Sequence, residues 1–350
     1  MKQRTWPSRS DGSRFSTTFS LPNKKSSRKE EDVQASKRWI DDGLPTTGTP
    51  SNSLARSTSS ATTDGHDFSN LPYDVLAKIA ASFTLPKLKA ASLVCKSWCD
   101  ALRPLREAMI LLRWGKRFKH GKAGVRPNLE KALDSFLKGA SRGSTMAMVD
   151  AGLVYWETGK KEEAMALYQR AAVLGDPAGQ FNLGISFLQA VPPNPEEAVK
   201  WLYKSAIAGH VRARYQLALC LHQGRGINHN IQEAARWYLK AAEGGYVRAM
   251  YNISLCYSFG EGLVQNHRQA RKWMKLAADH GHSKAQFEHG LALFSEGQML
   301  KAVVYLELAS RAGERAAARV KNVILQQLSA TSRDGVMLQA DNWRTLPSDC

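Results

Sequence analysis

Several features that would point to other classes of protein are missing from this 350-residue sequence. No apolar run reaches the ~18–20 residues needed to span a bilayer. The first residues, MKQRTWPSRSDG, lack the apolar segment that is typical of a secretory signal. The five cysteines include no pair with zinc-ribbon spacing, and their odd number favours a reducing compartment. We therefore expect no membrane association and a location in the nucleus, the cytoplasm or both.

Signatures of catalysis are missing as well. The sequence contains no Gly-x-x-x-x-Gly-Lys-Ser/Thr loop, no His-Glu-x-x-His pair and no Gly-x-Ser-x-Gly elbow. His280, His282 and His289 come nearest to a metal-binding cluster, but histidines on helical faces are usually structural or solvated. The sequence therefore favours a binding protein over an enzyme, and it predicts no cofactor and no metal.

Acidic residues are scarce relative to basic ones. The chain holds 31 Asp and Glu against 49 Lys and Arg, a formal net charge of +18. Residues 1–65 contribute 11 basic and 7 acidic side chains, so most of the excess lies further along the chain. These 65 residues are rich in Ser and Thr and poor in apolar side chains, which predicts a disordered tail. The basic cluster Lys24–Lys29 could act as a nuclear import signal, and the stretch that it ends also resembles an organelle transit peptide.

The chain does contain a tryptophan that recurs at a fixed interval. Trp201, Trp237 and Trp273 lie 36 residues apart in similar phrases, such as WLYKSAIAGHVRARYQLALC and WYLKAAEGGYVRAMYNISLC. Alignment on the glycine that follows each phrase gives six copies with spacings of 32 to 36 residues, at Gly143, Gly175, Gly209, Gly245, Gly281 and Gly313. Repeats of this length predict a stacked solenoid, which offers a long binding surface rather than a cleft. We interpret the Trp ladder as packing core.

Each copy has the pattern of two helices. Apolar residues recur at helical spacing, as at Ala213, Leu217 and Cys220. The glycines suit turns with a positive φ angle. Four asparagines stand where a helix should begin, and a side-chain oxygen there can accept a bond from a backbone N–H: Asn128, Asn194, Asn230 and Asn266. Three of them are followed at the third position by the acid or amide of a capping box: Glu197, Glu233 and Gln269.

These copies resemble the Sel-one-like repeat (SLR) family, which is related to the tetratricopeptide repeats. The third to fifth copies match the family pattern A–x–LG–Y–G–GV–N–A–W–Y–KAA–G well, the first two lack its Gly-x-Gly loop, and the sixth is degenerate. The resemblance implies an α–α solenoid of about six repeats over residues 111–328, followed by a C-terminal tail over residues 329–350.

A second pattern occupies residues 66–110. It comprises Leu71-Pro72, then Leu85-Pro86, then Leu93-Val94-Cys95-Lys96 and Trp98, within three short predicted helices whose core is too small to be stable alone. This segment resembles an F-box. The resemblance implies docking onto the Skp-type adaptor of a cullin-containing ubiquitin ligase. The adaptor face that it implies consists of Leu71, Pro72, Leu76, Ile79, Leu93, Val94 and Cys95.

Basic residues recur at equivalent positions of the repeats, where a solenoid would align them in ladders. One set lies three residues after the Trp position: Lys138, Arg170, Lys204 and Lys240. Two others lie one residue before it and three residues after the glycine: Lys200, Arg236 and Lys272, and Arg212, Arg248 and Lys284. We interpret them as candidate contacts for an acidic or phosphorylated protein target or for nucleic acid. The alternative is a solvated helix face that only promotes solubility.

The sequence thus predicts an all-α protein in which a three-helix F-box precedes the solenoid. The function that this organisation favours is that of a non-catalytic substrate receptor in an SCF-type (Skp–cullin–F-box) ubiquitin ligase. Two alternatives stay open: a basic helical-repeat protein that binds nucleic acid, and an F-box scaffold that promotes no turnover.

Overall fold

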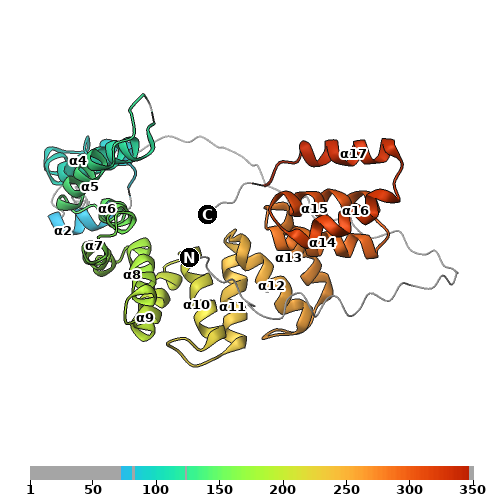
Figure 1. The fold of residues 1–350 in the computed structure, drawn as a ribbon. Helices are drawn as coiled ribbons and strands as arrows, with labels where there is room; N and C mark the ends of the chain where they lie inside the picture. Colours follow the sequence, from blue (N-terminus) through green and yellow to red (C-terminus); the bar gives the residue numbers. More distant parts are fainter. Residues whose placement is uncertain (1–71, 81–82, 123, 347–350) are drawn as a thin grey trace, which may run out of the picture. The chain divides into compact units, whose positions relative to one another are not determined.

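The computed structural model describes residues 72–80, 83–122 and 124–346, and every regular element in these ranges is a helix (Figure 1). The all-α prediction is therefore confirmed, whereas the predicted N-terminal tail and Leu71 lie outside the described residues. The helices are α2 Tyr73–Ala80, α3 Leu85–Ala91, α4 Lys96–His120, α5 Leu129–Ser141, α6 Thr145–Glu157, α7 Lys161–Val173, α8 Pro177–Gln189, α9 Pro195–Ile207, α10 Val211–Gln223, α11 Ile231–Glu243, α12 Val247–Phe259, α13 His267–Asp279, α14 Ser283–Ser295, α15 Met299–Arg311, α16 Arg315–Gln326 and α17 Ala330–Asp341.

The first three described helices enclose a small core. Helices α2 and α3 both pack against α4. The buried side chains are Leu76 and Ala80 from α2, Leu88 from α3 and Leu102 from α4. Phe83 and Trp98 pack at the margin of this cluster. A core of this size leaves much of the surface of the three helices exposed to partners.

Helix α4 belongs to two modules at once. It runs without interruption for 25 residues, across the boundary that the sequence analysis placed at residue 110. Its first half carries Leu102 of the small core, and its second half packs against α5. A Cβ atom added at Gly115 would collide with the ring of Phe136 on α5, so glycine permits this close packing. The chain is thus helical throughout residues 96–120, and no loop separates the two modules.

The repeats are built from 13-residue helices that pack closely in consecutive pairs. The eighth residue of one helix is small and faces a large buried residue at the eighth position of the next. Gly184 on α8 faces Leu202 on α9 in this way, and Gly290 on α14 faces Leu306 on α15. The equivalent small residues in the other pairs from α6 onward are Gly152, Ala218 and Ser254. The contact is therefore a repeating feature of the solenoid core.

The predicted helix caps are present. Asn128, Asn194, Asn230 and Asn266 each accept a hydrogen bond through Oδ1 from the backbone N–H three residues later, at 2.8–3.1 Å. The Glu233 carboxylate accepts a bond from Trp237 Nε1 at 3.3 Å, and the Glu197 carboxylate lies 3.0 Å from Lys200 Nζ. The predicted capping boxes are therefore wrong in their second bond, because the N–H groups of the N-cap asparagines donate to backbone carbonyl oxygens instead. The acceptors are those of Phe187 for Asn194, Leu221 for Asn230 and Tyr257 for Asn266, at 2.9–3.0 Å.

The helices that follow the glycine turns are capped by different residues. Gly209 and Gly281 have φ angles of 93° and 85°, as predicted. The next residue in each case is a histidine whose Nδ1 accepts a bond from a backbone N–H at 3.2 Å, namely His210 and His282. Their rings pack on aromatic neighbours, and burial lowers the pKa of both histidines to about 4. His282 is thus a structural cap.

The last helix lies in the segment that the sequence analysis assigned to a C-terminal tail. Helix α17 packs against α15, and its buried residues Val336 and Ala340 join the cluster around Leu306. Trp343, two residues beyond α17, packs at the edge of the same cluster. The described part of the chain includes no helix that is both long and apolar enough to span a membrane.

The close approach of paired helices predicts that Gly→Ala substitutions have opposite effects on stability at two positions. A Cβ atom at Gly184 would lie 2.8 Å from Leu202 Cγ, whereas one at Gly335, on α17, would meet no atom within 4 Å. We expect Gly184→Ala to destabilise the protein by roughly 1–3 kcal/mol through overpacking. Gly335→Ala should stabilise it by up to about 1 kcal/mol through helix propensity. Unfolding in urea, followed by circular dichroism, measures both, and an equal response of the two variants would contradict this account of the core.

The histidine caps predict a loss of stability in acid. In the folded state the pKa values of His210 and His282 are about 4, below the ~6.5 of an unfolded chain. Between these pH values the unfolded chain binds more protons, so the contribution present above pH ~6.5 is lost as the pH falls toward 4. The loss should be on the order of 2 kcal/mol per histidine. A His210→Asn/His282→Ser variant keeps the caps without titrating. Its melting temperature should therefore fall less than that of the wild-type protein between pH 7 and pH 5. Equal decreases in the two proteins would refute the prediction.

Candidate protein-interaction surfaces

The small N-terminal module exposes several apolar side chains. Leu93 and Val94, in the loop between α3 and α4, are 86% and 63% exposed. On α2, Tyr73, Val75 and Ile79 are also exposed, while the neighbouring Leu76 and Ala80 face the core. Helix α2 therefore has two apolar faces. One packs in the core of the module, and the other is exposed to solvent. Neighbouring apolar side chains that stay exposed make this face a candidate surface for contact with another protein.

The structure describes six of the seven residues of the implied adaptor face, and they fall into three groups. Pro72, Ile79, Leu93 and Val94 are exposed. Leu76 is 2% exposed and belongs to the core, so it supports the surface from beneath. Cys95 is half-buried and caps α4, where its Sγ accepts a bond from the Trp98 N–H at 3.4 Å. Leu71 lies outside the described residues, and the adaptor contact of the whole set stays a prediction. The face implied by the sequence did not include Tyr73 and Val75, which are exposed apolar residues of α2.

The ladder that follows the Trp position has local partners. Lys204 Nζ lies 4.2 Å from the centroid of the Trp201 ring, and Lys240 Nζ lies 4.5 Å from that of Trp237. Lys138 pairs with Asp134 at 2.7 Å, and Arg170 is exposed. The cations over the indoles thus help to cover the aromatic rings, an arrangement worth about 0.5–1 kcal/mol at exposed sites.

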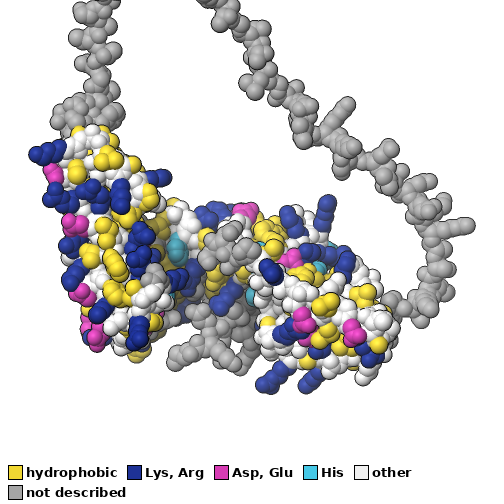
Figure 2. Space-filling view, turned by 90° about the horizontal axis from the view of Figure 1, so that it is seen from above, with side chains coloured by type: hydrophobic (Ala, Val, Ile, Leu, Met, Phe, Trp, Pro, Cys, Tyr) yellow, Lys and Arg dark blue, Asp and Glu magenta, His cyan; other side chains and the backbone are white. Residues whose placement is uncertain are grey.

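The other two ladders are mostly exposed. Lys200, Arg236, Lys272, Arg212 and Arg248 are exposed, whereas Lys284 is half-buried. Among these, Lys200 pairs with Glu197, and the Arg212 guanidinium lies 4.9 Å from the centroid of the Phe181 ring. Figure 2 shows Lys and Arg side chains spread over the visible face, with acidic side chains less common. The ladders therefore form a basic surface, but several of their side chains already have an acidic or aromatic partner.

Comparison with known proteins identifies both modules. The F-box domain model matches residues 68–107. The Sel1 repeat model matches residues 111–144, 151–176, 177–210, 211–246, 247–282 and 283–314. The Arabidopsis thaliana protein described as "F-box protein At1g70590" is 64% identical over 359 residues, which cover 99% of each chain. This chain is a plant-type F-box protein with Sel1 repeats. Both modules belong to typically non-catalytic families and support a role as a protein-interaction adaptor.

One solved structure supports the fold of the Sel1 region. The crystal structure of a Sel1 repeat protein from Oxalobacter formigenes matches with a TM-score of 0.51 at 24% identity and covers 68% of this chain and 97% of that one. A protective antigen of uropathogenic Escherichia coli with an SLR fold matches at 20% identity with a TM-score of 0.45, over 71% of this chain and 63% of that one.

Helix α4 adds a further surface. Ile110, Arg113, Trp114 and Arg117 follow one another at helical spacing, and their side chains line a shallow pocket. The Arg117 guanidinium lies 5.0 Å from the centroid of the Trp114 ring. This α4 stripe comes directly after the F-box match, and it combines an aromatic side chain with arginines, residue types that are enriched at protein interfaces.

The three histidines considered as a metal cluster have separate roles. His282 caps α14, the ring of His289 packs edge-on against Tyr305 with centroids 4.6 Å apart, and His280 Nδ1 lies 3.2 Å from the Leu346 carbonyl oxygen. Within the described ranges, no three potential ligand side chains come together in a way that could hold a metal ion.

Proposed function

We propose that this protein is the substrate-recognition subunit of an SCF-type ubiquitin ligase. The F-box would bind a Skp-type adaptor and through it a cullin, and the Sel1 solenoid would recruit a protein target for ubiquitination. The observation that carries the proposal is the exposure of Leu93 and Val94 beside the apolar outer face of α2. A module with so small a core gains stability when a partner covers such side chains.

The target side of the proposal rests on charge and shape. The solenoid presents a long surface, and its exposed ladder residues are basic. An acidic or phosphorylated segment of a target would complement this surface, and the α4 stripe would add an aromatic contact. A ligase with this receptor would act in the nucleus, the cytoplasm or both. An F-box scaffold without turnover would use the same surfaces, and an assay of target ubiquitination separates it from a receptor.

Co-purification with a Skp-type adaptor tests the proposal directly. We expect the Leu93→Ser/Val94→Ser variant to lose at least ~30-fold in adaptor affinity, the equivalent of about 2 kcal/mol for an interface anchor. Both side chains are largely exposed, so the variant should keep its helical content. The matched control is Val173→Ser/Leu174→Ser at the end of α7, where the two residues are 71% and 61% exposed. This control should bind the adaptor like the wild type.

Two results would contradict the proposal. Absence of adaptor binding by the folded wild-type protein would remove the ligase role. Equal losses in the α7 control and the F-box variant would show that adaptor binding depends on general surface apolarity. In the first case, nucleic-acid binding becomes the leading function. It would be recognised by an affinity for single-stranded RNA that falls steeply with added salt.

A further inference from the structure

The end of the described chain crosses the last repeats as a segment without regular secondary structure. Helix α17 ends at Asp341, whose carboxylate is held by Arg311 of α15 at 2.6 Å. Residues 342–346 then run past the C-terminal end of α13. The Leu346 N–H donates to the Asp279 carbonyl oxygen at 3.1 Å, and the Leu346 carbonyl oxygen lies 3.2 Å from His280 Nδ1. We call residues 342–346 the C-terminal segment.

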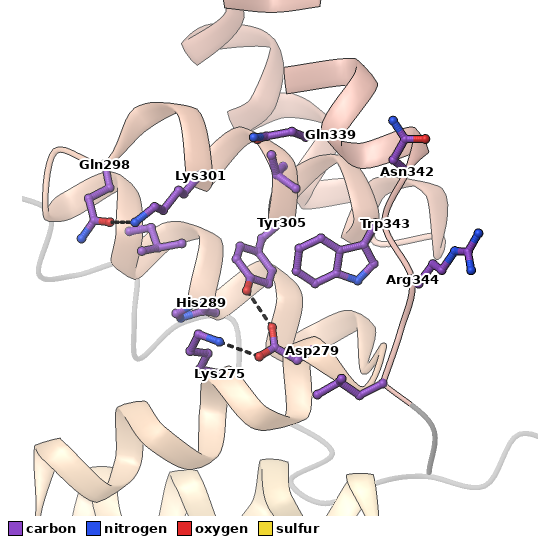
Figure 3. A pocket seen from close by; sticks show the side chains of 13 residues that line it. Lys275, Asp279, His289, Gln298, Lys301, Tyr305, Gln339, Asn342, Trp343 and Arg344 are labelled. Atoms are coloured by element: carbon purple, nitrogen blue, oxygen red, sulfur yellow. Dashed lines mark hydrogen bonds and ion pairs between the residues drawn. The ribbon is translucent and has the colours of Figure 1, made fainter. Parts of the chain in front are cut away.

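Trp343 is the side chain that fixes this segment. Its ring meets Tyr305 in an edge-to-face arrangement, with centroids 5.2 Å apart and an angle of 67° between the planes. The Tyr305 hydroxyl in turn donates to Asp279 Oδ1 at 2.7 Å, and Lys275 Nζ lies 2.6 Å from the other oxygen of that carboxylate. Burial and the neighbouring Asp279 raise the pKa of Tyr305, so it remains a neutral donor. Figure 3 shows Trp343 beside Tyr305, with Asp279 and Lys275 below them.

These contacts follow the logic of peptide recognition. In peptide-binding domains, backbone hydrogen bonds hold an extended chain, and a pocket for one side chain sets the specificity. Here Leu346 supplies the backbone contacts and Trp343 the inserted side chain. The receiving surface is formed by α13, α14 and α15 of the solenoid, and we call it the Tyr305 site.

The C-terminal segment leaves one hydrogen-bond donor unpaired and a cavity unfilled at the Tyr305 site. Trp343 Nε1 is buried and has no hydrogen-bond acceptor among the described residues. A buried donor without a partner costs about 1–3 kcal/mol. A cavity of about 770 Å³ also remains beside the segment, lined by Lys301, Tyr305 and Trp343 among others. A different segment could therefore fill the cavity and replace the unsatisfied indole.

We propose that the Tyr305 site is a peptide-binding site of the Sel1 solenoid, occupied in cis by the C-terminal segment. Its ligand is an extended segment of a partner protein that places an aromatic side chain against Tyr305 and bonds the Asp279 carbonyl through its backbone. The C-terminal segment competes with that ligand as an intramolecular occupant and lowers its apparent affinity. This site goes beyond the proposed ligase role, because it requires no contact with an adaptor.

A labelled peptide of residues 340–350 is the probe, and full-length protein is the receptor. In wild-type protein the C-terminal segment should block the site. In a Trp343→Ala receptor the segment loses its aromatic contact, so the peptide should bind at least ~10-fold more tightly, as measured by fluorescence anisotropy. A Leu346→Pro receptor, which lacks the donor to the Asp279 carbonyl, should also bind the peptide more tightly than wild type.

Variants of the peptide test its chemistry. A Trp343→Ala peptide should lose at least ~10-fold in affinity. A Trp343→Phe peptide should bind within a few-fold of the original, because it keeps an aromatic ring and removes the unsatisfied donor. Arg344→Ala is the matched control. Arg344 also lines the cavity, but its side chain points away from Tyr305 in Figure 3 and is exposed, so its loss should change the affinity of the peptide little.

The outcomes separate a binding site from simple end packing. If both receptor variants keep their helical content and neither binds the peptide more tightly than wild type, the contact only closes the end of the solenoid and the proposal is wrong. If Trp343→Ala loses helical content, the Leu346→Pro receptor decides alone. Adaptor binding is measured separately, so failure of the ligase proposal leaves this result interpretable.

Discussion

The solenoid depends on one repeated contact, between a small residue on one helix and a large residue on the next. At Gly184 and Gly290 even a methyl group would collide with a leucine side chain of the partner helix. Helices that approach this closely bury their facing side chains, as the 0% exposure of Leu202 and Leu306 shows. The capped ends, the glycine turns and the loops between pairs bring the helices to this distance, and the exposed residues of the repeats acquire their positions from it.

Much of this architecture was predictable because it repeats. The helix pairs, the asparagine caps and the turn glycines all recur with the period of the repeat, so each copy supports the reading of the others. The recurring tryptophan, however, was an imperfect guide to the core. Trp237 is 8% exposed, but Trp201 is only half-buried, and the large residue that follows it, Leu202, packs against the small partner. A core position inferred from a recurring tryptophan can therefore lie one residue away from the position that packs between the helices.

Features that occur once were harder to read. On α2, Leu76 follows Val75 directly, and both are apolar, so the sequence alone could not say which would face the third helix. In the structure Leu76 packs against α4, the third described helix, and Val75 stays exposed. Trp343 stands among polar residues without any periodic pattern, and only its contact with Tyr305, 38 positions earlier, reveals its role. Non-local contacts of this kind are set by tertiary packing and carry no local signal.

The shared helix α4 links the stability of the F-box to that of the solenoid. The F-box core has few buried side chains, and Leu102 on α4 is one of them. The same helix seats Gly115 against Phe136 in the first repeat. Because a helix gains most of its stability from tertiary packing, contacts at one end of α4 favour helical structure at the other. The first repeat therefore does more than begin the solenoid: through α4 it helps to hold α2, α3 and the exposed Leu93 in place.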